Sequence, residues 1–213
     1  INAVIIVGML ALSVWAWWQL PSGSQVPTHF NIQGVPDRYG GKAEGLLLLP
    51  LITLGIMLIN LAIPKIAPHQ QNIKRSGQAY AVISVGIVAF MSIVHIVIIS
   101  SALGKSVNVN AVLSIAMGLL FIVLGNYLSK IRRNYFLGVR TPWTLSSELA
   151  WHRTHRLASW LFILHGFAFV VSGLLSSRVL LSVLVVSILI CSLLVLPGYS
   201  YLLWRSDANR SID

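Results

Sequence analysis

Residues 125–156 read GNYLSKIRRNYFLGVRTPWTLSSELAWHRTHR and form a strongly charged segment in a chain that is otherwise apolar. The segment holds six of the fifteen Lys and Arg residues, two of the seven Trp residues and one of the five acids. Long apolar runs with almost no charge flank it on both sides. This pattern predicts a polar connection between two membrane-spanning helices.

A helix is predicted to begin within this segment, after the turn-prone Gly138. Thr141 suits the N-cap and Pro142 the first helical position, because proline fixes its own φ and lacks an N–H donor. The predicted interfacial helix then continues through Glu148, Trp151, His152 and His155.

The composition excludes a soluble globular protein. Hydrophobic residues make up 56% of the chain and charged residues 9%, and the mean hydropathy is +0.82, whereas a soluble domain carries about 25% charged residues. We therefore predict an all-α fold, a polytopic integral membrane helical bundle with one ordered extracellular loop and one cytoplasmic interfacial helix. Six spans of about 20 residues fit the length, and they are expected at 1–20, 46–63, 79–103, 109–128, 157–175 and 179–204.

Prolines and the single cysteine lie in or next to the predicted spans. The second span is expected to have Pro50 in its first turn and to be closed by Pro64. The single cysteine, Cys191, has no partner for a disulfide and suits a small apolar position in a helix.

Residues 1–64 are predicted to form a helical pair joined by an outward loop at 21–45, and residues 65–213 a four-helix domain that contains segment 125–156. The long apolar first run lacks a basic start, which favours a retained helix over a cleaved signal peptide. The loop is rich in Pro and Gly, which is typical of turns and short strands. It could be a plain solvated connector, but its aromatic and hydrogen-bonding side chains favour a recognition surface made by His29, Phe30, Asn31, Gly34, Asp37 and Tyr39.

Basic residues predict the orientation in the membrane, because Lys and Arg are retained on the cytoplasmic side. With a cytoplasmic N-terminus, eleven Lys and Arg residues fall inside and four outside, as counted from the sequence. Both termini and segment 125–156 are therefore expected in the cytoplasm of a multi-pass plasma-membrane protein. The net charge of +10 then reflects topology and attraction to anionic membrane lipids rather than direct nucleic-acid binding.

Two segments resemble one protein family. The loop segment PTHFNIQGVPDRYGGKAE is similar to the short N-terminal domain of unknown function found in bacterial SdpI-type membrane proteins. Segment 125–156, continued by LASWLF, is similar to the signature segment of that family. The residues that carry this second resemblance are Asn126, Asn134, Gly138, Arg140, Thr141, Pro142, Trp143, Thr144, Trp151 and His155.

The resemblance implies a bacterial immunity protein and receptor of the cell membrane. Such a protein protects its producer from a secreted toxic peptide and also signals by holding a transcriptional repressor at the membrane. For this chain, the implied partners are a toxic peptide at the outward loop and a cytoplasmic repressor at segment 125–156. The resemblance implies no cofactor and no catalytic residue.

A membrane metalloenzyme is an alternative that the sequence leaves open. Glu148, His152 and His155 would share one helix face at the spacing of many metal ligands. The favoured interpretation is structural: Glu148 pairs with Arg140, Arg153 or Arg156, and the histidines bond to backbone carbonyls. The sequence contains no HExxH motif, which would support a metalloenzyme. We therefore expect neither catalysis nor a bound metal.

A small transporter or lipid-handling protein is the other alternative. Ionisable residues at mid-depth are candidates for function, and the third and fifth spans place His95 and His165 there. A continuous polar cavity lined by His95, His165 and Asn60 would support transport. Interhelical hydrogen bonds would instead indicate packing, which is the favoured interpretation because no acid lies within a predicted span.

Overall fold

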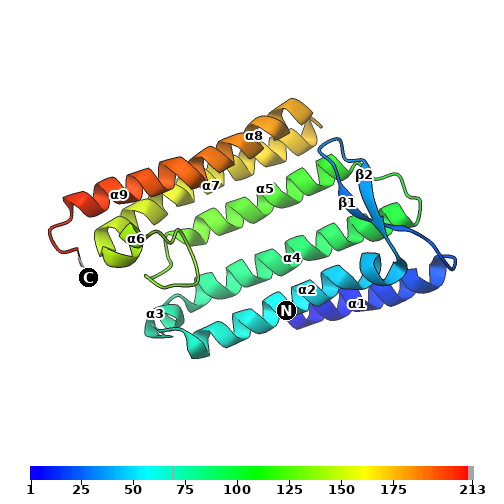
Figure 1. The fold of residues 1–213 in the computed structure, drawn as a ribbon, viewed down its shortest axis with the longest axis horizontal. Helices are drawn as coiled ribbons and strands as arrows, with labels where there is room; N and C mark the ends of the chain where they lie inside the picture. Colours follow the sequence, from blue (N-terminus) through cyan, green and yellow to red (C-terminus); the bar gives the residue numbers. More distant parts are fainter. Residues whose placement is uncertain (69, 211–213) are drawn as a thin grey trace.

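The computed structural model describes residues 1–68 and 70–210, and Figure 1 shows its elements side by side along one long axis. A two-stranded sheet lies at one end of the bundle, and two short helices, α3 and α6, lie at the other. The elements are α1 (Asn2–Gln19), β1 (Val26–Phe30), β2 (Pro36–Gly40), α2 (Lys42–Ile66), α3 (Gln70–Arg75), α4 (Gly77–Ala102), α5 (Val109–Leu128), α6 (Pro142–Ser146), α7 (Glu148–Leu174), α8 (Arg178–Ile190), a π-helical turn (Cys191–Val195) and α9 (Leu196–Ser206).

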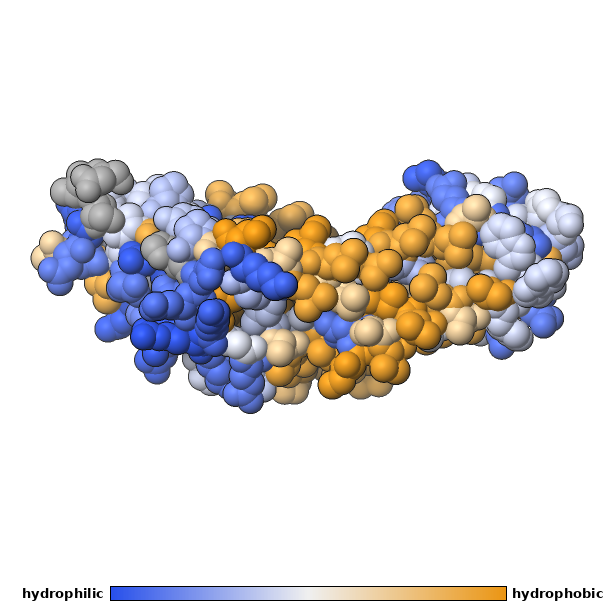
Figure 2. Space-filling model, turned by 90° about the horizontal axis from the view of Figure 1, so that it is seen from below, coloured by the Kyte–Doolittle hydropathy of each residue, from blue (hydrophilic) through white to orange (hydrophobic). Residues whose placement is uncertain are grey.

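The predicted fold class is confirmed. Six helical segments among the described residues are long and apolar enough to cross a membrane, the last of them made of α8, the π-helical turn and α9 together. Figure 2 shows an apolar band across the middle of the molecule, with hydrophilic surfaces at both ends. The chain is therefore a multi-pass membrane protein whose two polar ends lie on opposite sides of the bilayer.

Helix α4 lies between two groups of helices. It contacts α1 and α2 on one side and α5 on the other, and α7 then packs against α5, α8 and α9. The α5–α7 contact is unusually close, because a Cβ added to Gly118 of α5 would lie 2.5 Å from the carbonyl oxygen of Gly166 in α7. Small residues at such a crossing allow two backbones to approach closely, which is a main source of helix association in membranes.

Helix α2 is longer than predicted and contains both of its prolines. It begins at Lys42 and ends at Ile66, so Pro50 is not in its first turn and Pro64 does not close it. A proline within a helix leaves the carbonyl four residues earlier without its N–H donor. Neighbouring helices supply these donors: Ser13 Oγ donates to Leu46 O at 2.6 Å, and the Tyr80 hydroxyl donates to Asn60 O at 2.6 Å.

The interfacial helix is also different from the prediction. A helix does begin at Pro142, but it ends at Ser146, and Ser147 has an extended backbone with φ −142° and ψ 125°. The Ser147 hydroxyl accepts a hydrogen bond from the N–H of Ala150 and so caps a new helix. That helix, α7, runs without interruption from Glu148 to Leu174, so the predicted interfacial residues from Glu148 onward form the first turns of the fifth span.

The loop at 21–45 contains an ordered antiparallel hairpin, as its short-strand chemistry predicts. Val26 pairs with Gly40 and Phe30 pairs with Pro36, with an irregular register between them. The hairpin is held on the bundle by Val26, which is fully buried in one cluster with Leu46 of α2 and Ile98 of α4. The hairpin is thus fixed at one end of the helical bundle.

Candidate functional site

The tip of the hairpin is shaped by two of the predicted recognition residues. The Asn31 side-chain oxygen accepts hydrogen bonds from the N–H groups of Gln33 and Val35, both at 3.0 Å. Gly34 has a φ of +76°, which L side chains rarely adopt. Asn110 at the start of α5 donates to Ile32 O at 2.9 Å and fixes the tip over the helix ends.

A cavity of about 370 Å³ lies between this tip and helices α5, α7 and α8. Phe30, Asn31 and Ile32 form its hairpin side. Its other walls are mainly apolar and include Leu113, Met117, Phe121, Phe169, Leu181 and Val185. A mainly apolar cavity with a few polar groups at its mouth is a common form of ligand site, and we take this hairpin cavity as the candidate site.

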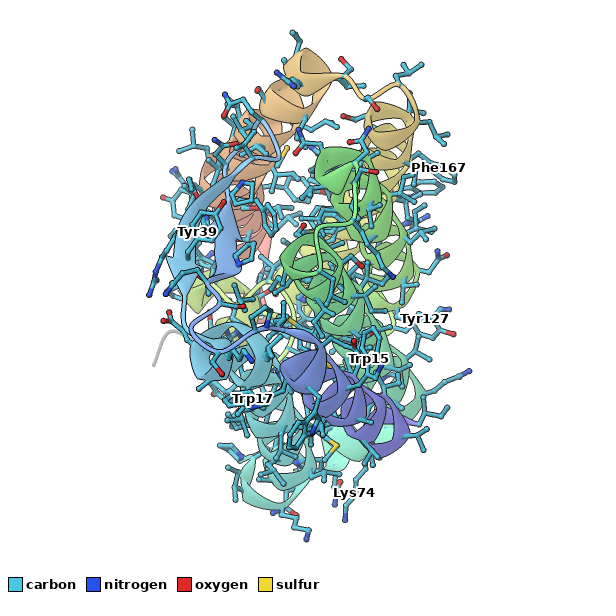
Figure 3. All side chains as sticks on the ribbon, turned by 90° about the vertical axis from the view of Figure 1, so that its right-hand side faces the viewer. Trp15, Trp17, Tyr39, Lys74, Tyr127 and Phe167 are labelled. Carbon is cyan, nitrogen blue, oxygen red and sulfur yellow. The ribbon has the colours of Figure 1, made fainter. Side chains whose placement is uncertain are left out.

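The other predicted recognition residues lie on the hairpin but do not line the cavity. His29 Nδ1 is 2.5 Å from Asp37 Oδ1, and both side chains are exposed. Tyr39 is 53% exposed, and Figure 3 views the molecule from this end with Tyr39 on the hairpin. Of the six predicted recognition residues, Phe30 and Asn31 therefore line the cavity, and the sequence did not predict its helical walls. Their apolar side chains resemble those of any membrane span, so only Asn110, a polar residue at a helix start, gave a signal.

The opposite polar end contains the signature segment. Asn134 is almost fully buried there, and its side chain organises the loop between α5 and α6. Its oxygen accepts from the N–H groups of Phe136 and Leu137, both at 2.8 Å, while its nitrogen donates to Arg132 O at 2.8 Å. A buried side chain with this many backbone partners defines the loop conformation.

Trp151 and His155 of α7 hold the same loop through hydrogen bonds to its backbone. Trp151 is fully buried, and its Nε1–H donates to Ile131 O at 2.8 Å. His155 stacks on Trp151 with ring centroids 4.0 Å apart. His155 Nδ1–H donates to Trp151 O at 2.8 Å, and Nε2 accepts from the N–H of Val139 at 3.0 Å. Both ring nitrogens of His155 are therefore occupied by structural bonds.

Helix α6 connects the loop to α9. Thr141 and Thr144 form a reciprocal capping box, and Thr141 Oγ1 lies 2.9 Å from Ser200 Oγ in α9. Trp143 packs edge to face on Tyr201, with centroids 5.3 Å apart. The network thus joins the loop, α7 and α9.

A second contact holds Asp207, the residue directly after α9. The Ser147 hydroxyl donates to Asp207 Oδ2 at 2.5 Å. This bond is the main reason why the pKa of the Asp207 carboxyl lies below its ordinary value, and a hydrogen bond from the N–H of Asn209 is the second.

Two predicted signature residues stay outside this network. Asn126 donates to Ile122 O of its own helix at 2.8 Å. Arg140 is exposed and donates to Tyr135 O at 2.7 Å. Both side chains are exposed and bond to a backbone carbonyl four or five residues away.

The ion pairs that Glu148 makes in the structure differ from the predicted ones. Its carboxylate contacts Arg133 Nε at 3.1 Å and His152 Nε2 at 3.4 Å, rather than Arg140, Arg153 or Arg156. His155 points to the loop instead, as its bonds to Trp151 and Val139 show. Within residues 1–68 and 70–210, no group of three or more His, Cys, Asp or Glu residues is placed to hold a metal ion. Glu148, His152 and His155 therefore do not converge on one metal position.

His95 and His165 make interhelical hydrogen bonds. His95 Nε2 lies 2.9 Å from Ser13 Oγ, joining α4 to α1. His165 Nε2 lies 2.8 Å from Ser187 Oγ, joining α7 to α8. Asn60 donates to Ile56 O of its own helix. The interhelical bonds of His95 and His165 favour a packing role, which was the favoured interpretation of the sequence.

The chain matches two family models. Residues 130–199 match the SdpI/YfhL protein family, and residues 4–54 match a domain of unknown function, DUF1648. The chain is 23% identical over 155 residues to the immunity protein SdpI of Bacillus subtilis (strain 168). The aligned region covers 71% of this chain and 75% of that protein. No solved structure matches the chain.

Proposed function

Because the chain is an SdpI-type membrane protein, we propose that it is an immunity protein that protects a bacterial cell from a secreted antimicrobial peptide. We propose the orientation predicted from the basic residues, with both termini in the cytoplasm and the hairpin outside. In this role the protein binds a peptide and does not catalyse a reaction. The matched relative is named an immunity protein, which supports this class of function.

The hairpin cavity is the observation that carries the proposal. It opens beside an ordered hairpin at one polar end of the molecule, and its walls come from three spans. An apolar side chain of a peptide that approaches the membrane could enter between Phe30 and Met117. The exposed His29–Asp37 pair and Tyr39 would contact the polar part of the same peptide.

The signature segment is proposed as the cytoplasmic part of the receptor. Its loop is tied to α7 through His155 and to α9 through Thr141, and α7 also forms one wall of the hairpin cavity through Phe169. Helix α7 thus reaches both ends of the molecule. We extend the proposal to a repressor held at this inner surface, with exposed Arg140 as its contact.

A lipid-handling protein is the second candidate, because the same cavity is mainly apolar and its walls include membrane-spanning helices. An acyl chain would fit these walls as well as an apolar peptide side chain does. The two candidates differ in the hairpin, since a peptide requires His29, Asp37 and Tyr39 whereas an acyl chain does not contact them.

Cell survival tests the proposal. A host that lacks SdpI-type proteins is made to express the chain and is challenged with a panel of purified secreted antimicrobial peptides. Met117→Trp fills the cavity and should abolish protection at unchanged membrane abundance. The matched control is Leu119→Trp on the same helix, because Leu119 is 54% exposed and does not line the cavity. Equal protection by both variants would contradict a cavity site, and no protection by the wild-type chain against any peptide would favour the lipid-handling candidate.

A further inference from the structure

A second cavity, of about 480 Å³, lies at the opposite end of the molecule between the end of α5 and the first half of α7. Its polar lining includes Asn126 from α5, Ser129 directly after α5, and His152, Arg156 and Ser159 from α7. On α7 these residues follow a spacing of three or four, so they lie on one face of the helix. We call this space the basic groove.

Arg156 gives the groove an uncompensated positive charge. Throughout residues 1–68 and 70–210, no carboxylate lies within ion-pair distance of the Arg156 guanidinium. Glu148, the acid on the same helix, is already paired with Arg133 and His152. Arg156 is exposed, and its five donors can bind an anion such as phosphate through two parallel hydrogen bonds.

Ser159 provides a second, independent observation. Its side chain is only 7% exposed, and its hydroxyl has no hydrogen-bond partner. A buried polar group without a partner costs free energy, and its presence in a native structure calls for an explanation such as a bound ion or water. Ser159 lines the groove together with Asn126, Ser129 and Arg156.

An apolar surface continues from the groove along α7 toward the middle of the membrane. Trp160, Leu164 and Phe167 are 62%, 62% and 59% exposed. They are four and three residues apart and therefore share one helix face. Figure 3 shows Phe167 pointing away from the bundle. A ligand that fits both surfaces has an anionic head and an apolar tail, with Trp160 between them at the depth where tryptophan is favoured.

We propose that the basic groove binds a phosphate group carried by an anionic phospholipid, with the phosphate at Arg156 and an acyl chain along Trp160, Leu164 and Phe167. The shared chemistry is a phosphate that bears a net negative charge. Anionic lipids are abundant in the cytoplasmic leaflet, which matches the side proposed for this end of the chain. This site is distinct from the hairpin cavity and does not require that a peptide bind there.

Lipid titration of the purified full chain tests the proposal. Protein in neutral detergent is titrated with phosphatidylglycerol, and bound lipid is counted by native mass spectrometry. Arg156→Gln should raise the apparent Kd about tenfold, because it removes charge-assisted hydrogen bonds. Arg153→Gln is the matched control, since it removes the same charge from an exposed position of α7 that does not line the groove. Phosphatidylcholine, which has no net charge, should bind more weakly than phosphatidylglycerol.

A second variant and a soluble probe complete the test. Asn126→Leu removes a polar group from an exposed position and should also weaken phosphatidylglycerol binding, independently of Arg156. Inorganic phosphate in excess should not displace the lipid. Displacement by phosphate that depends on Arg156 would overturn the lipid as the ligand and assign the groove to a soluble phosphate compound. Equal lipid affinity in the wild type, Arg156→Gln and Asn126→Leu would overturn the site itself.

Discussion

Gly138 and His155 are placed so closely that no side chain fits between them. A Cβ added to Gly138 would lie 2.1 Å from His155 Nε2, and Gly138 also has a φ of +100°. The next residue, Val139, donates its N–H to the same nitrogen at 3.0 Å. Since Nε2 accepts this bond, the imidazole is neutral and Nδ1 carries the proton. The loop of the signature segment therefore closes directly on α7 at this point.

Gly138→Ala should destabilise the end of the protein that holds the signature segment. The substitution forces a side chain into an unfavourable φ, which costs about 1–3 kcal/mol, and also displaces His155 from Val139. Thermal unfolding in detergent should show a lower midpoint. Gly8→Ala is the control, because nothing lies within 4 Å of the added Cβ and alanine favours a helix. Equal midpoints for the two variants would show that the closure contributes little to stability.

His155→Ala should lower stability without changing metal content. The substitution removes the stack on Trp151 and leaves the Val139 N–H without its acceptor, a combined loss of about 2–4 kcal/mol. Elemental analysis and thermal unfolding of the purified variant measure the two effects. His152→Ala, at an exposed position, should be close to neutral. A stoichiometric metal in the wild type that disappears in His155→Ala would instead restore the metalloenzyme alternative.

Cysteine labelling tests the orientation. In a Cys191→Ser background, a cysteine at the exposed hairpin position Gln33 should react with an impermeant reagent added to intact cells. A cysteine at Asn209, near the contact between Ser147 and Asp207, should react only after the membrane is opened. This outcome is expected because basic residues are concentrated at that end. Labelling in the opposite sense would place the hairpin in the cytoplasm and remove the basis for peptide binding.

Two substitutions test the division of roles between the ends. Arg140→Lys keeps the charge but changes the donor geometry that reaches Tyr135 O, so membrane abundance and protection should persist while a repressor-dependent reporter weakens. Asp37→Asn removes the charge opposite His29, so protection should weaken. The output of the repressor-dependent reporter should be retained, because the signature segment is unchanged. If neither substitution alters either output in a protein that remains folded, the proposed division of roles is wrong.

The sequence was sufficient for the fold class, because long apolar runs and the lack of charge leave few alternatives in a membrane. It was less informative about helix ends. Pro50 and Pro64 indicated boundaries for α2, but donors from Ser13 and Tyr80, remote in sequence, allow the helix to continue. Ser147 ends one helix and starts another within a polar run, which local propensity does not resolve.

The candidate site was only partly predictable for the same reason. The hairpin residues Phe30 and Asn31 are conspicuous among turn residues, whereas Met117 and Phe169 have no feature that separates them from other residues of a span. The spacing of Glu148, His152 and His155 suggested one cluster, but the turn of the loop around Gly138 engages His155 separately. Tertiary contacts, rather than helical periodicity, decided this outcome.

Photo-crosslinking at the hairpin cavity tests whether a peptide binds there. A photoreactive phenylalanine analogue is placed at Ile32, which lines the cavity and is 45% exposed, in cells challenged with a peptide against which the wild type protects. Binding in the cavity should give a crosslink between that peptide and position 32. The crosslink should be lost when Met117→Trp is added, and the same analogue at Leu119 should give none. Protection without any crosslink at position 32, or an equal crosslink from Leu119, would contradict peptide binding at this site.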